Sequence, residues 1–264
     1  MVHLQRILET TRATVARRKR EVPVEELLDR AAKHVPRGFA QALRSVPDGP
    51  AIIAELKKAS PSKRLVREDF DPAALARGFE AGGAAALSVL TDAPYFQGSL
   101  RNLEIASSVT ALPCLRKDFI VAEYQIVEAR AHRADAILLI AAALSDAELE
   151  RFTGAARRYG LDVLCEIHSE EELDRVRGLG CDAFGVNNRN LETFEVSLES
   201  SLRLADRLPA NAVRVAESGI YTPDDIERLR AAGFDAFLIG ESLMRQPDPG
   251  AALQALLAPA AERM

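Results

Sequence analysis

Short apolar runs alternate with helix-length amphipathic segments from residue 51 onward. The runs are rich in Val, Ile, Leu and Ala, a composition typical of strands buried on both faces of a parallel sheet. Eight runs are present: Ala51 to Leu56, Ala84 to Leu90, Ala111 to Leu115, Ala136 to Ile140, Leu161 to Ile167, Ala183 to Val186, Ala212 to Ala216, and Phe234 to Ile239. Eight strands joined by helices predict an α/β protein with a single (β/α)8 TIM barrel.

The amphipathic segments begin and end with recognisable signals. Their first residues offer an oxygen to the free N–H groups of a helix start, and proline at the first helical position costs little. These starts are Asp71-Pro72, Ser145 with Glu148, Ser169 with Glu172, and Thr222-Pro223. Glycine suits the left-handed position that ends a helix. It stands shortly before a strand as Gly83, Gly160, Gly180 and Gly233.

A weak internal repeat places an aspartate just before three of the runs. These residues are Asp135, Asp182 and Asp235, each followed by alanine and an apolar residue. Repeated sequence implies repeated local geometry, and strand starts lie at the face of a barrel that serves stability. We therefore expect structural roles for the three aspartates.

The first 48 residues are predicted to form a helical cap. One face of the first helix, over roughly twenty residues, carries Leu4, Ile7, Leu8 and Val15. Further helical stretches follow near Val24 to Lys33 and Gly38 to Arg44, before residues 47–50 break the chain with two prolines and a glycine. We interpret residues 1–264 as one barrel domain with this N-terminal extension.

Composition disfavours several kinds of partner. The formal net charge of -5 argues against a basic surface for nucleic acid. Apolar runs stay well short of the ~18 residues that a membrane span requires. The three cysteines are widely spaced, so buried free thiols are expected. We expect a cytoplasmic protein that binds neither nucleic acid nor membrane, with a monomer favoured and an oligomer left open.

Polar residues gather where the predicted strands end. Catalytic groups of a (β/α)8 barrel lie at the carboxyl ends of its strands. The residues at these ends are Glu55, Lys57, Lys117, Glu166, Asn187, Arg189, Glu217 and Ser218. Glu55 and Glu166 fall within the last positions of apolar runs, where a purely structural strand rarely accepts a carboxylate. The pattern therefore predicts an active site.

Lys117 is the predicted chemical centre. It comes just after the third run, in Leu115-Arg116-Lys117-Asp118-Phe119. An amine at the rim of a strand can have its pKa lowered by partial desolvation or by neighbouring cations. We therefore expect Lys117 to be an acid that is usable near neutral pH.

Glycines follow the last two runs, as Gly219 and Gly240. They allow backbone N–H groups to approach an anion, which is the usual phosphate site of this fold. The histidines and cysteines show no metal-ligand spacing, and no dinucleotide-binding motif follows the first run. We expect a phosphorylated small-molecule substrate and neither metal nor cofactor. His168, two residues beyond Glu166, is interpreted as a loop residue.

Several of these segments resemble the indole-3-glycerol-phosphate synthase family over nearly the whole chain. The resemblance rests on Glu55 to Ser62, Leu115 to Phe119, Glu166, Asn187 to Arg189, Ala216 to Ile220, and Leu238-Ile239-Gly240 followed by Ser242-Leu243-Met244. It implies a carboxy-lyase of tryptophan biosynthesis. The implied reaction is ring closure, decarboxylation and dehydration of 1-(2-carboxyphenylamino)-1-deoxyribulose 5-phosphate to indole-3-glycerol phosphate.

The resemblance also implies roles for individual residues. Lys117 protonates the ketone during ring closure, and Glu166 is the base of the dehydration. Glu55 and Lys57 are candidates for the complementary roles, and the choice between Lys57 and Lys117 for the last proton stays open. The implied substrate-binding residues are Lys57, Asn187, Arg189, Glu217, Ser218, Phe96 and Phe119. The implied phosphate-binding residues are Ser60, Gly219, Gly240, Glu241 and Ser242.

Two positions depart from the family pattern. Arg64 stands where the first loop usually has glycine, which predicts a stiffer loop or an extra charge near the phosphate. Glu241 stands where some members have serine, and a carboxylate aimed at a phosphate repels it. Glu241 can therefore serve through its backbone only if its side chain faces away.

Two other classes of function are weighed against this one. A sugar-phosphate isomerase or a Schiff-base aldolase using Lys117 is disfavoured by the set of Glu55, Lys57 and Glu166. An inert barrel that binds metabolites or scaffolds a complex is disfavoured by the complete set of polar residues, and an activity assay discriminates it.

Overall fold

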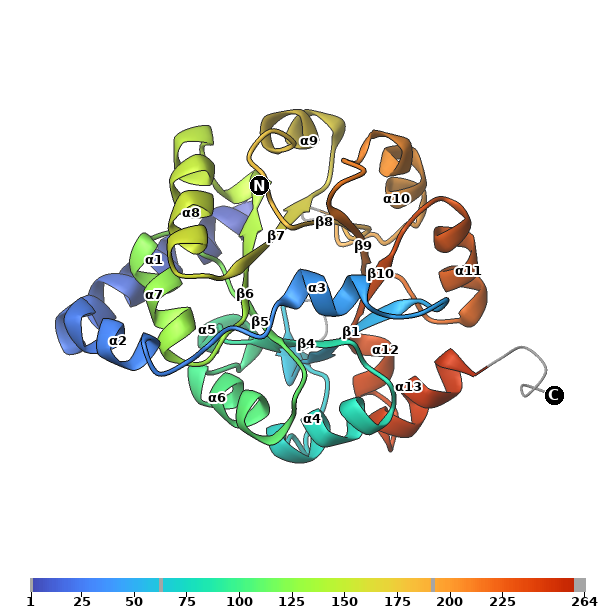
Figure 1. Cartoon of the computed structure of the whole chain (residues 1–264), viewed down its shortest axis with the longest axis horizontal. Helices are drawn as coiled ribbons and strands as arrows, with labels where there is room; N and C mark the ends of the chain where they lie inside the picture. Colours follow the sequence, from blue (N-terminus) through green and yellow to red (C-terminus); the bar gives the residue numbers. More distant parts are fainter. Residues whose placement is uncertain (1, 62–63, 191–192, 259–264) are drawn as a thin grey trace.

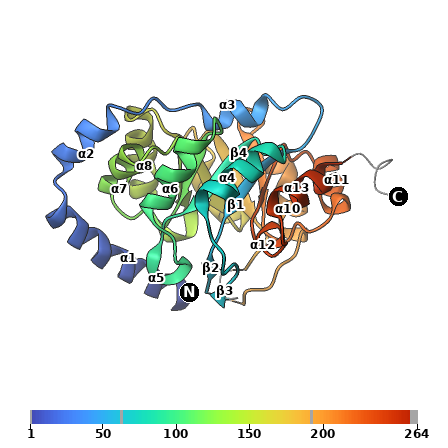
Figure 2. The ribbon, with the colours of Figure 1, turned by 90° about the horizontal axis from the view of Figure 1, so that it is seen from below.

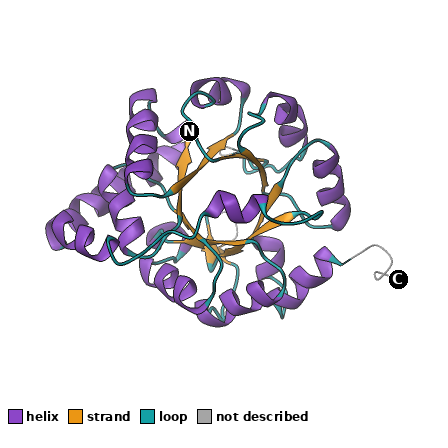
Figure 3. Cartoon of the chain, viewed as in Figure 1, coloured by secondary structure: helices purple, strands orange, loops and turns teal. Residues whose placement is uncertain are grey.

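Eight parallel strands close into a barrel in the computed structural model, which describes residues 2–61, 64–190 and 193–258 (Figures 1 and 3). The strands are β1 (Ala51–Leu56), β4 (Ala86–Leu90), β5 (Cys114–Lys117), β6 (Ala136–Ile140), β7 (Asp162–Ile167), β8 (Ala183–Asn187), β9 (Val213–Glu217) and β10 (Ala236–Ile239). The predicted (β/α)8 TIM barrel is confirmed. The third run shows the largest displacement, while the other strands begin within two residues of their runs. β5 begins after Pro113, because proline lacks the N–H group of a central strand.

A short antiparallel hairpin follows β1 and was not predicted. It consists of β2 (Ala59–Ser60) and β3 (Arg64–Leu65). Arg64 has a φ of 54°, in the left-handed region that favours glycine. This backbone conformation gives a physical reason for the glycine of the family pattern. Ser62, which ends the first segment of the resemblance, lies outside the described residues.

Helices surround the barrel, as Figure 3 shows. Their bounds are α1 (Val2–Glu21), α2 (Val24–Ala31), α3 (Phe39–Arg44), α4 (Pro72–Ala81), α5 (Ala93–Phe96), α6 (Leu100–Val109), α7 (Glu123–Ala131), α8 (Asp146–Arg158), α9 (Glu170–Val176), α10 (Glu199–Leu204), α11 (Pro223–Ala231), α12 (Glu241–Met244) and α13 (Pro249–Leu257). The four predicted caps accept backbone N–H groups through the side chains of Asp71, Ser145, Ser169 and Thr222. A positive φ is found at each predicted helix-ending glycine, namely Gly83, Gly160, Gly180 and Gly233.

The three repeated aspartates join neighbouring strands at their starts. Asp135 Oδ2 accepts a hydrogen bond from the N–H of Cys114 at the start of β5. Asp182 Oδ2 and Asp235 Oδ2 accept in the same way from Val163 of β7 and from Arg214 of β9. The repeat therefore reflects one contact made at three places in the barrel, and the predicted structural roles are confirmed.

The N-terminal helices lie on two sides of the barrel. Phe39 and Leu43 of α3 are buried with the inward-facing residues of the strands and close the amino end of the barrel. Val15 of α1 and Leu27 of α2 instead pack against α7. Figure 2 shows α3 at one end of the barrel and α1, α5, β2 and β3 toward the other. The division of the chain at residue 48 stays a prediction.

The outer layer of the core lies between the strands and the helices. It includes Cys114, Cys165 and Cys181, which are buried free thiols as predicted. Among the described residues, no helix is long and apolar enough to span a bilayer.

Candidate active site

The charged residues form the top layer of the barrel interior. Successive side chains of a strand point to opposite faces, so every second residue points inward. The inward positions next to the site are apolar and include Ile53, Leu115, Leu164 and Val215. Two residues further along the same strands stand Glu55, Lys117, Glu166 and Glu217. The interior of the barrel is thus apolar below the site, and the charged side chains form the layer above it.

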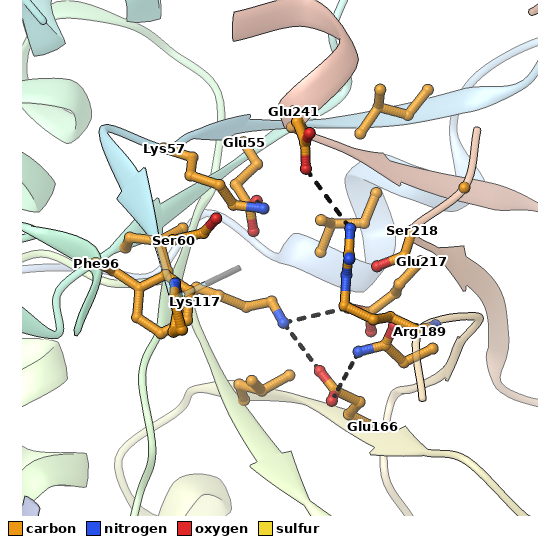
Figure 4. A pocket seen from close by; sticks show the side chains of 18 of the residues that line it. Glu55, Lys57, Ser60, Phe96, Lys117, Glu166, Arg189, Glu217, Ser218 and Glu241 are labelled. Atoms are coloured by element: carbon orange, nitrogen blue, oxygen red, sulfur yellow. Dashed lines mark hydrogen bonds and ion pairs between the residues drawn. The ribbon is translucent and has the colours of Figure 1, made fainter. Parts of the chain in front are cut away.

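All predicted site residues line one cavity at this end of the barrel (Figure 4). The residues brought together there are Glu55, Lys57, Ser60, Phe96, Lys117, Phe119, Glu166, Asn187, Arg189, Glu217, Ser218, Gly219, Gly240, Glu241 and Ser242. They come from the ends of several strands and from the loops that follow. A substrate in the cavity can therefore reach every group that the sequence singled out.

Lys117 lies among carboxylates at the centre of the site. Its Nζ is 2.9 Å from Glu166 Oε2 and 3.2 Å from Glu217 Oε2. Burial lowers the pKa of the Lys117 ammonium, but Glu166, Glu217 and Glu55 outweigh burial and raise the pKa above its ordinary value. The expected lowering of this pKa was wrong, because the amine has carboxylate neighbours where we expected cations. The side chain of Lys117 is therefore an ammonium near neutral pH.

Glu166 and Glu217 differ in charge state although both contact Lys117. Burial raises the pKa of Glu166, but Lys117 and His168 lower it to about 2. The amide of Asn187 also donates to Glu166 Oε1 at 3.1 Å. Burial raises the pKa of Glu217 to about 7. Glu166 is therefore a carboxylate near neutral pH, while Glu217 is divided between its acid and carboxylate forms.

Two glycines make room for the buried carboxylates. An added Cβ at Gly185, inside β8, would overlap the carboxylate of Glu217 on the neighbouring strand β9. An added Cβ at Gly240, after β10, would overlap the carboxylate of Glu55 on β1. Gly240 was expected only to expose backbone to a phosphate, and the structure adds this second role.

A lysine also accompanies Glu55. Lys57 Nζ lies 2.5 Å from Glu55 Oε1, and the Ser88 hydroxyl donates to Glu55 Oε2 at 3.5 Å. The cavity therefore holds a second ammonium–carboxylate pair besides Lys117 with Glu166. The two pairs provide two proton donors and two potential bases within one site.

The loop after β9 has an unusual backbone. Ser218 has a φ of 67° and Gly219 a φ of 79°. An added Cβ at Gly219 would lie 2.6 Å from Val196 Cγ1. The absence of a side chain at Gly219 is therefore required by backbone conformation and by packing against Val196, and not only by the approach of an anion. Strained backbone of this kind is concentrated at functional sites.

Glu241 does not face away from the cavity. It lines the cavity, and its Oε2 lies 3.5 Å from the guanidinium of Arg189, as Figure 4 shows. Its Oε1 lies 3.2 Å from Arg245 Nε. Phosphate binding through the Glu241 backbone was expected only if its side chain faces away, and the structure does not meet this condition. The two guanidinium groups offset the negative charge that a phosphate would otherwise encounter.

Phe96 and Phe119 form an apolar wall. Their ring centroids are 6.3 Å apart, and both residues line the cavity. Tilted ring pairs at such distances are favourable, and their faces suit a planar aromatic group. Phe96 belongs to α5, whose first N–H groups are capped by Asp92.

Sequence reasoning missed several residues of the site. Asp92 lines the cavity, and burial raises its pKa to about 6. Its place one residue before Ala93-Pro94 is a helix-start signal that could have drawn attention to it. Phe194 and Tyr221 also line the cavity, but they lie in loops without periodicity. Gly185 could have been found, since glycine inside a strand often marks a close approach.

The fold and the site together define a (β/α)8 barrel enzyme whose half-buried lysines and buried carboxylates suit acid–base chemistry. The family profile described as Indole-3-glycerol phosphate synthase matches residues 4–256. The chain belongs to the indole-3-glycerol phosphate synthase family.

Individual relatives agree with this assignment. The indole-3-glycerol phosphate synthase of Koribacter versatilis (strain Ellin345) is 59% identical over 255 residues, which cover 96% of this chain and 98% of that protein. The one of Azospirillum brasilense is 52% identical over 258 residues, covering 97% and 98%. A solved N-acetylmannosamine-6-phosphate 2-epimerase from Clostridium perfringens has a TM-score of 0.59 and 16% identity, covering 76% of this chain and 89% of that chain. The epimerase supports the fold alone.

Proposed function

We propose that the chain carries out the indole-3-glycerol phosphate synthase reaction by general acid–base catalysis, with Lys117 as the acid and Glu166 as the base. The substrate is 1-(2-carboxyphenylamino)-1-deoxyribulose 5-phosphate, and the reaction belongs to tryptophan biosynthesis. The observation that carries the assignment of roles is the contact of Lys117 with Glu166 and Glu217 inside the cavity. A proton donor and a base are thus available to one bound molecule.

The first step is ring closure. The aromatic carbon that bears the carboxylate attacks the ketone carbon, and the ketone oxygen takes a proton. Lys117 is fully protonated because Glu166, Glu217 and Glu55 raise its pKa. The developing alkoxide is a much stronger base than these carboxylates, so it can still accept a proton from Lys117. Loss of carbon dioxide then restores the aromatic ring.

The second step is loss of water. Glu166 removes a proton from the methylene carbon next to nitrogen in the new ring, and an acid protonates the hydroxyl that leaves the adjacent carbon. The Lys117 ammonium keeps the pKa of Glu166 low. Glu166 therefore becomes a better base once Lys117 has given its proton to the substrate. Lys57, paired with Glu55, is placed to supply the last proton, and so is Lys117 once it has taken up a proton to replace the one given in ring closure.

The remaining lining residues are proposed to hold the substrate. Lys57 attracts the carboxylate of the anthranilate part, while Phe96 and Phe119 contact its ring. The other holders are Asn187, Arg189, Glu217 and Ser218. The phosphate is placed near the loops after β9 and β10 and near β2, where it meets Ser60, Gly219, Gly240 and Ser242, while the carboxylate of Glu241 is held by Arg189 and Arg245.

We also propose that the enzyme acts as a monomer in the cytoplasm. All the residues singled out from the sequence meet in one cavity of a single chain, which supports a site that is complete within one subunit. The buried free cysteines suit a reducing compartment. Size-exclusion chromatography with light scattering tests the first statement.

Borohydride distinguishes acid catalysis from Schiff-base chemistry at Lys117. In the proposed reaction Lys117 gives a proton and stays an amine, whereas an aldolase bonds its lysine to the carbonyl carbon. We expect the protein mass to stay unchanged after borohydride is added during turnover, and full activity to return once the reagent is removed and fresh substrate is supplied, because borohydride also reduces the ketone of the free substrate. Substrate-derived mass on Lys117, in proportion to lost activity, would contradict the proposal.

A further inference from the structure

His168 lies behind Glu166, outside the residues that line the cavity. It follows the end of β7, and its Nε2 is 3.4 Å from Glu166 Oε1. Its other ring nitrogen, Nδ1, is 3.3 Å from Glu172 Oε2, in the first turn of α9. The same carboxylate oxygen accepts the backbone N–H of His168 at 2.8 Å. The imidazole therefore lies between two carboxylates, one of which belongs to the active site.

This arrangement selects the charged form of the ring. A neutral imidazole carries one N–H, so one ring nitrogen presents a lone pair. Glu172 requires a proton on Nδ1, which leaves the lone pair of Nε2 directed toward Glu166. Nε2 is buried and has no hydrogen-bond partner among the described residues. Only the imidazolium has a proton for each of the two carboxylates.

Glu166 has three polar neighbours, and one of them loses its charge during the reaction. Lys117 becomes a neutral amine when it gives its proton to the substrate, so Glu166 then lacks this ammonium partner. Asn187 remains on Oε1, but an amide carries no charge. His168 is the neighbour that keeps both its place and its positive charge when Lys117 gives up its proton.

We propose that His168 is a positioning residue, whose imidazolium, anchored by Glu172, holds the carboxylate of Glu166 in place while Lys117 serves the substrate. The inference rests on the proposed role of Glu166 as a base. It extends the active site beyond the cavity wall, into a chain of three residues that runs from Glu166 through His168 to Glu172.

The charges around the imidazole agree with this role. Burial lowers the pKa of His168, but Glu172, Glu166 and Glu217 outweigh burial and raise it above its usual value. On the far side of Glu166 stands Lys117, which faces the carboxylate and not the imidazole. The active form of His168 is protonated, so turnover should fall as the pH rises through the raised pKa of His168. The raised pKa of Lys117 places any loss of its own proton at higher pH.

The test is the pH profile of kcat for the wild-type enzyme and for His168→Leu, His168→Gln and Glu172→Gln. We expect His168→Leu to lower kcat by roughly tenfold, with KM within about twofold because the residue does not touch the substrate. The decline of kcat on the alkaline side of the pKa of His168 should be absent from His168→Leu. His168→Gln, which keeps an N–H donor near Glu166, should recover part of kcat and also lack the decline.

Glu172→Gln leaves the imidazole in place and removes one carboxylate neighbour. We expect its decline of kcat to move to lower pH by about one unit, since an opposite charge within a few ångströms shifts a pKa by roughly that much or more. Glu148→Gln is the matched control, because Glu148 caps α8 as the third residue of a capping box, remote from the cavity lining. Its profile should equal that of the wild type.

Two results would overturn the inference. One is a kcat of His168→Leu within about twofold of the wild type, or a retained decline of kcat in this variant. The other is a decline of kcat in Glu172→Gln at the same pH as in the wild type and in Glu148→Gln. This second result alone tests the role of His168 if His168→Leu does not fold. Glu166→Gln is measured alongside. Retained turnover in Glu166→Gln would remove the proposed base itself, which is a different failure.

Discussion

Lys117 Nζ lies 2.9 Å from Glu166 Oε2, although Lys117 is the last residue of β5, Glu166 is the last but one of β7, and β6 lies between these strands. The inward position at the end of β6 is Ile140, which is apolar and aligned with Glu166. No polar group of β6 therefore competes for either partner. Each charge satisfies the other in this pair, so the proton that Lys117 gives to a substrate leaves Glu166 without its ammonium partner.

Gly185→Ala should disturb Glu217 from the neighbouring strand. The added methyl would overlap the Glu217 carboxylate, which contacts Lys117. Overpacking of this kind costs roughly 1–3 kcal/mol of stability. We expect an unfolding free energy lower by this amount and a kcat reduced by about tenfold or more, because a neighbour of the acid is displaced.

Gly154→Ala is the control for this substitution. An added Cβ at Gly154, in α8, meets no atom within 4 Å. Alanine in a helix interior is more stable than glycine by roughly 0.5–1 kcal/mol. Urea unfolding should therefore show a small gain with unchanged kcat. Wild-type stability and activity in Gly185→Ala would show that Glu217 is not confined as described.

Arg64→Gly should stabilise the protein. Arg64 has a φ of 54°, which costs a residue with a Cβ roughly 1–2 kcal/mol. Glycine removes this strain but loses about 0.5–1 kcal/mol of chain entropy, so a net gain of about 0.5–1 kcal/mol is expected. Arg64→Ala removes the same charge and keeps the Cβ. A melting temperature of Arg64→Gly at or below that of Arg64→Ala would contradict the strain.

The fold was predictable because it depends on regular patterns. The apolar runs and the caps at Asp71 and Thr222 are local, and the repeated aspartates make the same backbone contact at each occurrence. The lining of the cavity followed from the rule that barrel strands end at the active site. These features require no knowledge of distances between side chains.

Contacts between strands could not be predicted in the same way. The pKa of Lys117 has the opposite direction from the one expected, because its carboxylate neighbours come from β7, β9 and β1. The pairing of Glu241 with Arg189 likewise depends on how two loops meet. His168 resembled any loop residue until its contact with Glu166 was located. Spacing along the chain carries no information on these contacts, although it does indicate the i,i+4 pairs Glu241–Arg245 and His168–Glu172.

Glu217 should make stability depend on pH between about 4.5 and 7. Burial raises its pKa from 4.5 to about 7, so the folded protein binds more protons than the unfolded chain in this range. Stability then falls as the pH rises, by up to about 1.4 kcal/mol per pH unit, and the fall is complete above the folded pKa. Glu217→Gln has no group at this position that gains or loses a proton, so its stability lacks this dependence on pH.

The measurement is urea unfolding of both proteins at pH 5, 6 and 7. The stability of Glu217→Gln relative to the wild type should increase steadily across these pH values. Asp92→Asn is a useful control, because the pKa of Asp92 is raised from 3.8 only to about 6 and its influence should end there. Parallel curves for Glu217→Gln and the wild type would show that Glu217 is ionised throughout.

The most direct test of the account is the turnover of Lys117→Ala, followed by the indole fluorescence of the product. Lys58→Ala is the matched control, since Lys58 follows Lys57 in the chain but is not among the residues that line the cavity. Circular dichroism and thermal unfolding establish that both variants are folded. We predict that kcat falls by roughly 100- to 10,000-fold in Lys117→Ala, as expected for loss of a general acid, and stays near the wild-type value in Lys58→Ala. A folded Lys117→Ala that retains more than about a tenth of wild-type turnover would contradict the assignment of Lys117 as the proton donor.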